Sequence, residues 1–271
     1  MTMYPLPDAS TDLSQHRILV TNDDGIHSEG IQILEEAARR MSDDVWVVAP
    51  EFEQSGAGHS LTLSEPLRFR QFGDNHYAVR GTPTDCVVVA VSQVMTDKRP
   101  TLLLSGVNRG SNLGEDVTYS GTVAAAMEGT LLGIPSIAFS QVFAPPADGE
   151  MIIDWAAARE AVEPMTRWLM SFTWDADALM NVNFPDRRMG EIAGVDVTVQ
   201  GRRDLSDILL EERTDTRGQP YYWIGYRRGL DEPKAETDLR AVRHRAISVT
   251  PLHLDLTHFE TRRAMIESLE A

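Results

Sequence analysis

Apolar and polar positions follow two distinct patterns along the first half of the chain. Short apolar runs are typical of strands buried on both faces of a sheet, and segments with apolar residues three or four apart are typical of helices. The predicted strands are residues 18–21, 45–49, 102–105, 136–140 and 179–183, with alternating ones at 61–70 and 77–80. The predicted helices are residues 28–41, 84–94, 122–132 and 153–170. This alternation predicts an α/β fold with a mostly parallel sheet flanked by helices on both faces.

The last quarter of the chain has a different pattern. Polar and charged residues dominate 201–218, an aromatic segment covers 221–226, and a strand and a helix are predicted over 247–249 and 256–269. This part has too few apolar positions for a core of its own. We therefore expect the aromatic segment to pack against another element or subunit, and a nucleotide-stacking platform is the alternative. We expect the chain to divide into a flexible leader (1–15), a core (16–194) and an extension (195–271) that is not an independent domain.

The composition limits the classes of partner. The formal net charge is −16 over 271 residues, whereas proteins that bind a nucleic-acid duplex usually carry an excess of basic residues, so we expect no such partner. No stretch approaches the ~18 apolar residues of a membrane span, so we expect no membrane partner. The segment 1–15 lacks the basic start and apolar centre of a signal peptide. Cys86 is the only cysteine, which excludes an intrachain disulfide and favours a reducing cytoplasm.

Two adjacent carboxylates, Asp23 and Asp24, follow the first predicted strand directly. Ligands bind at the carboxyl ends of the strands in open α/β sheets. Two neighbouring carboxylates resist ionising together unless a cation holds them, so a metal site is the economical explanation. The alternative is that these residues only cap the helix that follows.

Polar loops also follow the other strands. Ser55 and Gly56 lie in a loop after the second strand, where the hydroxyl suits a metal or a phosphate; an ordinary glycine-rich turn is the alternative. Asn108, Arg109 and Asn112 follow the strand at 102–105 and offer a neutral oxygen ligand, a phosphate contact and a hydrogen-bonding amide. A long surface loop is the alternative there, although loops of this length in a compact domain are usually functional.

A third feature is the start of the predicted helix near residue 122. Ser120, Gly121 and Thr122 place free N–H groups and the positive end of the helix dipole where an anion can bind; simple helix capping is the alternative. The turn at 81–86 leads into another helix, and for Cys86 in this turn we expect a structural role.

The candidate ligands are all hard oxygens, which favours Mg²⁺ or Mn²⁺ over Zn²⁺. His27 and His59 lie near the proposed edge and could serve as acid or base groups. Ordinary surface or structural histidines are the alternative.

The combination of these segments resembles the SurE family, the stationary-phase survival proteins that act as metal-dependent nucleotidases. The resemblance is carried by ILVTNDDGIHSEGI, VVAPEFEQSGAGHSLTL, GTPTDCV, SGVNRGSNLGEDVTYSGTVAAAMEG and GIPSIAFS. Weaker matches continue through NVNFP, YYWIG, TDLRAV and SVTPLHLDLT, so the resemblance spans nearly everything after the leader.

The resemblance implies roles for individual residues. The metal ligands that it implies are Asp23, Asp24, Ser55 and Asn108, and the phosphate-binding residues are Asn112, Ser120, Gly121 and Thr122. It also implies a Rossmann-like core and a C-terminal extension that exchanges between subunits, which gives a homodimer or homotetramer. The chain departs from the family pattern at Gln54 and His59, where many members have Arg and Asn, so contacts of that loop to base or phosphate are in doubt.

The resulting prediction is a phosphomonoesterase, a 5′-nucleotidase that hydrolyses nucleoside monophosphates to nucleoside and phosphate. One divalent ion per subunit, Mn²⁺ or Mg²⁺, activates the attacking water, and we expect Asp23, Asp24 and Asn108 to be catalytic. We expect the same chemistry to extend to 3′-nucleotides, to short polyphosphate and to the broad substrate range of an acid phosphatase. The sequence leaves open the base, the metal, the oligomer and whether an aspartate acts as base or nucleophile. The rival predictions are a non-catalytic nucleotide-binding or regulatory module and, fitting less well, a metal-dependent glycosyltransferase.

Overall fold

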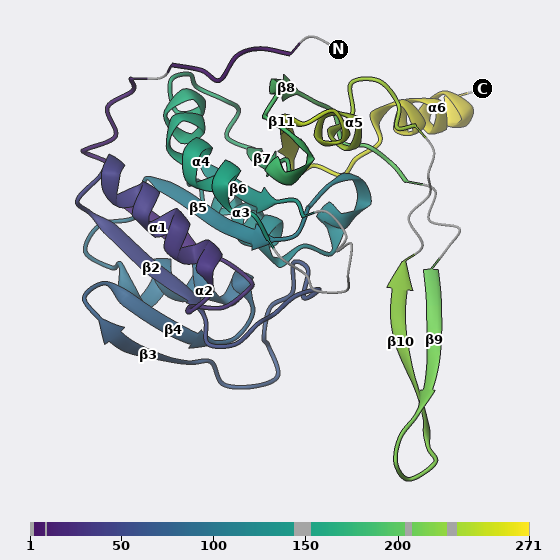
Figure 1. The fold of residues 1–271 in the computed structure, drawn as a ribbon, viewed down its shortest axis with the longest axis horizontal. Helices are drawn as coiled ribbons and strands as arrows, with labels where there is room; N and C mark the ends of the chain where they lie inside the picture. The colour runs from purple at the N-terminus through teal and green to yellow at the C-terminus, as the bar shows by residue number, and fades with distance from the viewer. Residues whose placement is uncertain (1–2, 9, 144–152, 204–207, 227–231, 271) are drawn as a thin grey trace.

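The computed structural model describes residues 3–8, 10–143, 153–203, 208–226 and 232–270. In these ranges, nine strands form one sheet in the order β3-β4-β2-β1-β5-β6-β7-β11-β8 (Figure 1). All neighbouring pairs are parallel except β3–β4 and β7–β11, which confirms the predicted mostly parallel α/β sheet. The strands are β1 (Ile18–Thr21), β2 (Val45–Pro50), β3 (Arg68–Gly73), β4 (His76–Arg80), β5 (Leu102–Arg109), β6 (Ser136–Gln141), β7 (Ala178–Phe184), β8 (Gly194–Val197) and β11 (Ala246–His253).

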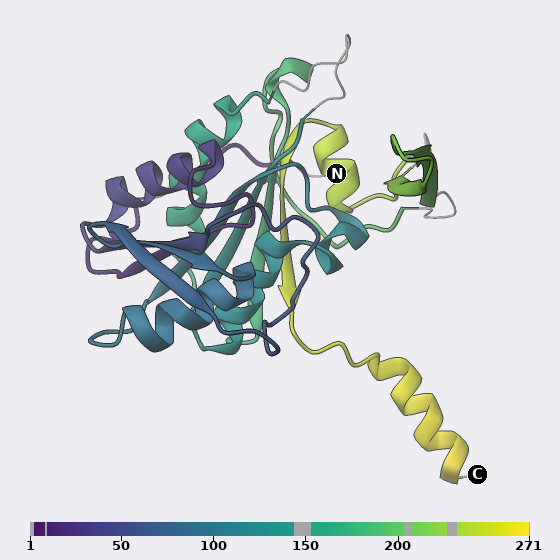
Figure 2. The same ribbon diagram turned by 90° about the horizontal axis from the view of Figure 1, so that it is seen from below.

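Helices cover both faces of the sheet and form two cores. Helices α1 and α4 pack on one face, and α2 and α3 pack on the other (Figures 1 and 2). Within β1, Ile18 and Val20 belong to the first core and Leu19 to the second. Both faces of the strand are buried, which explains why its sequence is a continuous apolar run. The helices are α1 (Glu29–Met41), α2 (Pro83–Val89), α3 (Gly121–Leu131), α4 (Ala156–Leu169), α5 (Asp238–Arg243) and α6 (Phe259–Glu270), with shorter helical turns over Ala90–Val94, Gly114–Thr118 and Arg187–Met189.

The C-terminal extension is divided between the body and two projections. Strands β8 and β11 belong to the main sheet, and α5 packs on β11. The predicted boundary at 194/195 therefore falls inside β8. Strands β9 (Ile208–Thr214) and β10 (Pro220–Tyr226) form a separate hairpin, and α6 extends away from the body (Figures 1 and 2). None of the helices in the described ranges has the length and apolar character of a transmembrane span.

The aromatic segment expected to pack against another element forms β10. Tyr222, Trp223 and Ile224 are exposed in the single chain, so packing against another element of the same chain is wrong for these residues. Packing against another subunit stays a prediction. The described residues of the leader contact the body: Leu13 is buried, and Tyr4 pairs with Val195 through two backbone hydrogen bonds of 2.9 and 2.7 Å.

Two strand predictions differ from the structure. The strand predicted over 61–70 begins only at Arg68, because pairing with β4 starts there. The strand predicted over 102–105 continues to Arg109, because β5 pairs with β6 again beyond an irregularity between Ser105 and Asn108. Asn108 and Arg109, which the sequence predicts in a loop, therefore lie on the sheet.

Candidate active site

Residues 22–25 form a tight turn directly after β1. The Asn22 amide donates to the Gly25 carbonyl (3.0 Å) and to the Ser28 hydroxyl (2.8 Å). Ser28 in turn caps α1 by accepting from the backbone of Ile31. Since Ser28 is the cap, the alternative that the two aspartates serve only as helix caps is wrong, and their carboxylates are left for another purpose.

Asp23 is a buried carboxylate with one firm partner. Its side chain is 4% exposed, and its Oδ1 accepts a hydrogen bond from the Thr122 hydroxyl on α3. The pKa of Asp23 is raised to about 6, mainly by burial and also by the charge of Asp24, while the Thr122 bond lowers it. A bound cation would relieve both causes of the rise.

Asp24 faces the end of β5. Its Oδ2 accepts from the backbone N–H of Arg109 (2.8 Å), which ties β1 to β5 at their carboxyl ends. Burial raises the pKa of Asp24, and this N–H opposes the rise. The Arg109 guanidinium lies 3.8 Å from Glu53, so a cation and an anion flank the pair of aspartates.

The loop after β2 brings Ser55 to the same edge. The Ser55 hydroxyl donates to Glu53 (3.0 Å), and the backbone N–H of Gln54 donates to the Asp23 carbonyl (2.8 Å). The far end of the loop is held by Asp85, whose carboxylate accepts from the backbone (3.0 Å) and the hydroxyl (2.6 Å) of Thr62. The loop is therefore anchored on both sides of Ser55.

Asn108 comes from the last part of β5, where it pairs with Ser140 of β6. Its amide nitrogen donates to the Gly110 carbonyl (3.0 Å), which leaves the amide oxygen for a ligand. The close approach of β6 requires glycine at position 106, because its φ is +127° and a Cβ there would lie 2.2 Å from the Phe139 carbonyl.

Asn112 is held by buried polar side chains that local sequence patterns do not reveal. Its backbone N–H donates to Asn183 (2.9 Å), and its carbonyl accepts from Asn181 (2.8 Å) and Asn183 (3.1 Å) on β7. Its side chain donates to Ser140 (2.8 Å). Asn181 and Asn183 belong to the NVNFP segment of the resemblance, which was the available signal for them.

These segments enclose a cavity of about 340 Å³ at the carboxyl edge of the sheet. It lies where the strand order reverses between β1 and β5, which is the usual ligand position in such sheets. The structure brings five of the predicted site residues to it. Its lining residues are Asp23, Ser55, Gly56, Asn108, Arg109, Gly110, Ser111, Asn112, Glu115, Asp116, Tyr119, Ser120 and Phe143.

Three predicted site residues lie behind or beside this cavity. Asp24 lines a neighbouring cavity of about 400 Å³, which shares Arg109 with the first. Gly121 lies against Asp23, since a Cβ at Gly121 would be 2.7 Å from the Asp23 Cβ. Thr122 is fully buried and contacts Asp23 through its hydroxyl. Ser120 does cap α3, by accepting from the backbone of Val123 (3.0 Å).

The donor set fits a hard divalent cation. The described residues contain no group of three or more His, Cys, Asp or Glu side chains arranged for a metal. A metal would therefore depend on the two aspartates together with the neutral oxygens of Ser55 and Asn108. This combination suits Mg²⁺ or Mn²⁺. The buried position of Asp23, with a second carboxylate beside it, supplies the local negative charge that such an ion requires.

The two histidines considered as acid or base groups do not line this cavity. His27 packs its ring against Phe72, with centroids 5.6 Å apart. His59 contacts the Glu128 carboxylate (3.0 Å) on α3.

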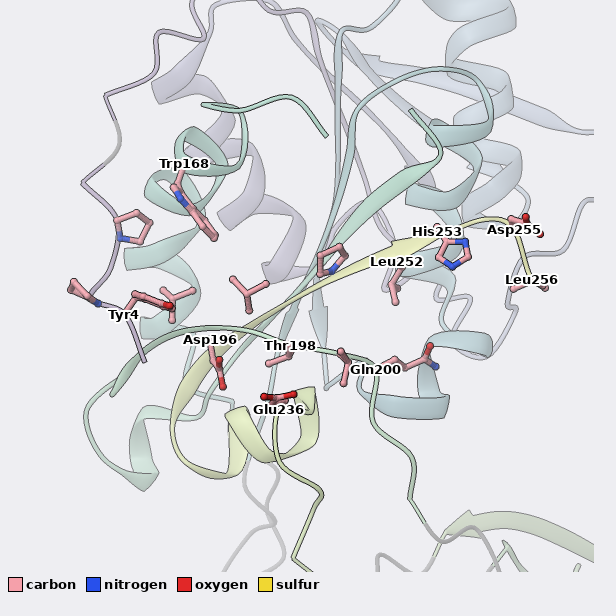
Figure 3. Close-up of a pocket in the computed structure, with 16 residues that line it drawn as sticks. Tyr4, Trp168, Asp196, Thr198, Gln200, Glu236, Leu252, His253, Asp255 and Leu256 are labelled. Atoms are coloured by element: carbon pink, nitrogen blue, oxygen red, sulfur yellow. The ribbon is translucent and has the colours of Figure 1, made fainter. Parts of the chain in front are cut away.

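A larger cavity lies elsewhere in the described part of the chain. It measures about 1040 Å³ and lies along β8 and β11, with Tyr4, Trp168 and Leu256 among its lining residues (Figure 3). None of the predicted site residues lines it. The chemistry of the lining residues, rather than the size of a cavity, therefore identifies the candidate site.

Comparison with known proteins shows which family the chain belongs to. Residues 18–207 match the family model described as "Survival protein SurE". The chain is 52% identical to the "5'-nucleotidase SurE" of Parvibaculum lavamentivorans over 253 residues (93% of this chain, 91% of the relative) and 52% identical to that of Rhodospirillum rubrum over 255 residues (94% and 97%). It resembles the crystal structure of the SurE protein from Aquifex aeolicus with a TM-score of 0.78 and 41% identity, covering 94% of this chain and 99% of that one. The chain therefore belongs to the SurE family of survival proteins.

Proposed function

We propose that the protein is a metal-dependent nucleotidase that hydrolyses nucleoside monophosphates to nucleoside and inorganic phosphate. The observation that carries the proposal is the cavity at the carboxyl edge, where Asp23, Ser55 and Asn108 come together from three separate segments. The relatives named 5′-nucleotidase SurE support the same reaction over nearly the full length of both chains. Both 5′- and 3′-monophosphates fall within the proposed range, and short polyphosphate is a side substrate.

Four side chains would hold one divalent ion, Mn²⁺ or Mg²⁺: Asp23, Asp24, Ser55 and Asn108. When bound, the ion supplies positive charge to the phosphoryl group and makes water a better nucleophile at neutral pH. Thr122 fixes the orientation of Asp23 through its hydroxyl. Because Asp23 and Asp24 are both required as ligands, we assign the attack on phosphorus to water rather than to an aspartate.

The other residues bind the phosphate. Arg109 is the one cationic side chain among the described residues that line the two cavities, and it places positive charge beside the aspartates. Ser120 lines the cavity at the start of α3, where the helix dipole favours an anion. Asn112 lines the same cavity and is fixed by its contacts to β7. Together these groups would stabilise the negative charge on the phosphoryl oxygens during attack.

The test is release of inorganic phosphate from AMP with Mn²⁺, with and without EDTA. We expect release that EDTA abolishes and that Asp23→Asn lowers by several orders of magnitude, while the exposed Asp74→Asn control keeps normal activity. Near-normal release from Asp23→Asn would refute the proposed site. Tight binding of AMP without release would favour the non-catalytic module, and a panel of monophosphates and metals would identify the preferred substrate and ion.

We also propose that the extension forms a homodimer or homotetramer and exchanges between subunits. Every residue of α6 described here is exposed in the single chain, and its Phe259, Met265 and Leu269 are apolar. A helix of this length is marginal in water without packing. The buried, lone Cys86 is compatible with the proposed cytoplasmic location.

A further inference from the structure

The loop that carries Asn112 is held by residues from the far C-terminal part of the chain. The backbone N–H of Gly114 donates to Asp238 (2.8 Å), and the Gly114 carbonyl accepts from Gln200 (2.8 Å). Asp238 belongs to the TDLRAV segment and is fully buried. The backbone of Gly114, two residues after Asn112, is therefore held at both its N–H and its carbonyl by the C-terminal extension.

The backbones of Gly114 and Gly201 lie close together at this contact. Gly114 has a φ of +58°, and a Cβ on it would lie 3.2 Å from the carbonyl of Gly201. Asp238 binds this second backbone segment as well, because its Oδ1 accepts from Gly201 (2.8 Å) and from Leu239 (2.7 Å). One carboxylate thus joins the loop, the segment that follows β8 and the start of α5 in a single cluster of hydrogen bonds.

Arg203 extends the same contact toward the cavity. Its guanidinium donates to the carbonyl of Leu113 (2.9 Å) and pairs with Asp116 (2.9 Å), and its backbone N–H donates to Glu115 (2.9 Å). Glu115 and Asp116 line the candidate active-site cavity. The arginine therefore offsets negative charge on the side of the cavity where a phosphate is expected to bind.

We propose that Asp238 is a positioning residue for phosphate binding: through Gly114 it fixes the loop that presents Asn112, so the C-terminal extension completes the active site. This inference rests on the proposed nucleotidase function. A carboxylate buried among backbone N–H groups is costly unless all of them remain paired. The two oxygens of Asp238 bind different segments: Oδ2 accepts from the loop, and Oδ1 accepts from the extension itself. The extension therefore contributes to substrate binding in addition to its proposed role in assembly.

Because the two oxygens bind different segments, Asp238→Asn selectively tests the contact between Asp238 and the loop. The remaining oxygen is expected to stay with the two N–H groups of Gly201 and Leu239, which turns the new amide NH₂ toward the N–H of Gly114. The matched control is Thr237→Ala, which removes the side-chain cap of α5 and touches no loop residue. Gln200→Ala is a second variant; its side chain is exposed, so the fold is expected to tolerate the change.

Three measurements on the full chain separate positioning from simple destabilisation. For Asp238→Asn we expect the KM for AMP and the inhibition constant of inorganic phosphate to rise about tenfold. The Mn²⁺ affinity, measured by calorimetry, stays within about twofold because the metal ligands lie on other segments. Hydrogen exchange of the amides at 112–119 becomes faster. For Gln200→Ala we expect the KM for AMP and the inhibition constant of inorganic phosphate to rise about threefold, with faster exchange of the same amides. For Thr237→Ala we expect none of these changes.

Two results would overturn the proposal. One is an unchanged KM, phosphate inhibition and exchange rate in both Asp238→Asn and Gln200→Ala. The other is an equal change in Thr237→Ala, which would mean that Asp238 acts only through stability. If the wild-type chain released no phosphate from AMP, the nucleotidase proposal would fail by itself, and hydrogen exchange in the variants would still decide whether Asp238 holds the loop.

Discussion

The carboxyl edge of the sheet and the projecting C-terminal elements depart from ordinary burial in opposite directions. The edge buries polar side chains such as Asp23, Asn112 and Asn183, while β10 and α6 expose apolar ones such as Trp223 and Leu269. Burial of a polar group costs free energy unless it is hydrogen-bonded, and exposure of apolar area forgoes stabilisation. Hydrogen bonds offset this cost for Asn112 and Asn183. Under the proposed function, a cation would offset the cost for Asp23, and a second subunit would cover the apolar side chains of the projections.

The largest expected effect concerns the cost of burying Asp23 without a metal. The pKa of this carboxyl is about 6 in the folded chain, against an ordinary value of 3.8. Since each pKa unit corresponds to about 1.4 kcal/mol, Asp23→Asn should raise the free energy of unfolding by on the order of 3 kcal/mol in EDTA at pH 8. The measurement is urea denaturation.

The sign of this effect depends on pH. A raised folded pKa means that the ionised group destabilises the fold fully above about pH 6, and that this penalty disappears as the pH falls toward the ordinary value of 3.8. The advantage of Asp23→Asn should therefore shrink steadily toward pH 4, while the exposed Asp74→Asn shows no comparable gain at either pH. Equal stability of Asp23→Asn and wild type at pH 8 would contradict the expectation that the buried negative charge of Asp23 destabilises the folded chain.

The next prediction concerns the hairpin formed by β9 and β10. Leu210, Tyr222 and Ile224 share one face of the hairpin, because they pair across it or alternate along β10. If this face contacts a second subunit, Tyr222→Ser together with Ile224→Ser should weaken association about 100-fold, as expected when interface anchors are lost. Sedimentation velocity measures the change, and Gln219→Ser at the turn is the control. The same mass distribution in both variants would show that the exposed hairpin has another role.

The two regions also differ in how well the sequence predicted them. The strand at Ile18–Thr21 and the position of Asp23 and Asp24 at its carboxyl end followed from a local apolar run and a general rule of α/β sheets. The hairpin was recognisable only as an aromatic segment, because its partner strand β9 ends in the polar residues Glu211–Thr214 and because the apolar side chains of β10 are exposed in the single chain.

Contacts between distant segments account for what the sequence did not predict at the site. Asn183 and Asp238 reach the Asn112 loop across 71 and 124 positions of sequence, and no local periodicity encodes such contacts. Asn108 was expected in a loop but lies on β5, because pairing with β6 resumes after an irregularity that local sequence patterns do not indicate. Residue types thus predicted the chemistry of the site, and tertiary contacts determined its exact geometry.

A smaller effect tests the support of Asp23 from α3. Thr122→Val keeps the shape of the side chain and removes the hydroxyl that lowers the pKa of Asp23. The pKa should rise further, so protons should compete with Mn²⁺ at higher pH. We expect kcat/KM to fall about tenfold and the acid limb of Mn²⁺ binding to move upward. Thr130→Val is the control, because its buried hydroxyl on the same helix contacts only a helix carbonyl; an identical pH profile in the two variants would rule out the Thr122 contribution.

The smallest effect concerns the departure from the family pattern at Gln54. Its backbone N–H binds the Asp23 carbonyl, so its side chain starts beside the candidate metal site. Gln54→Arg would add a cation at the rim of a strongly acidic protein, and the KM for AMP should fall about threefold at low salt through attraction of the phosphate. Gln54→Leu has no charge and should not show this gain. The lower KM of Gln54→Arg should return to the wild-type value as salt is added, because salt screens long-range electrostatic attraction. Screening leaves a direct contact largely intact. A lower KM that persists at high salt would therefore mean that the arginine binds the substrate directly.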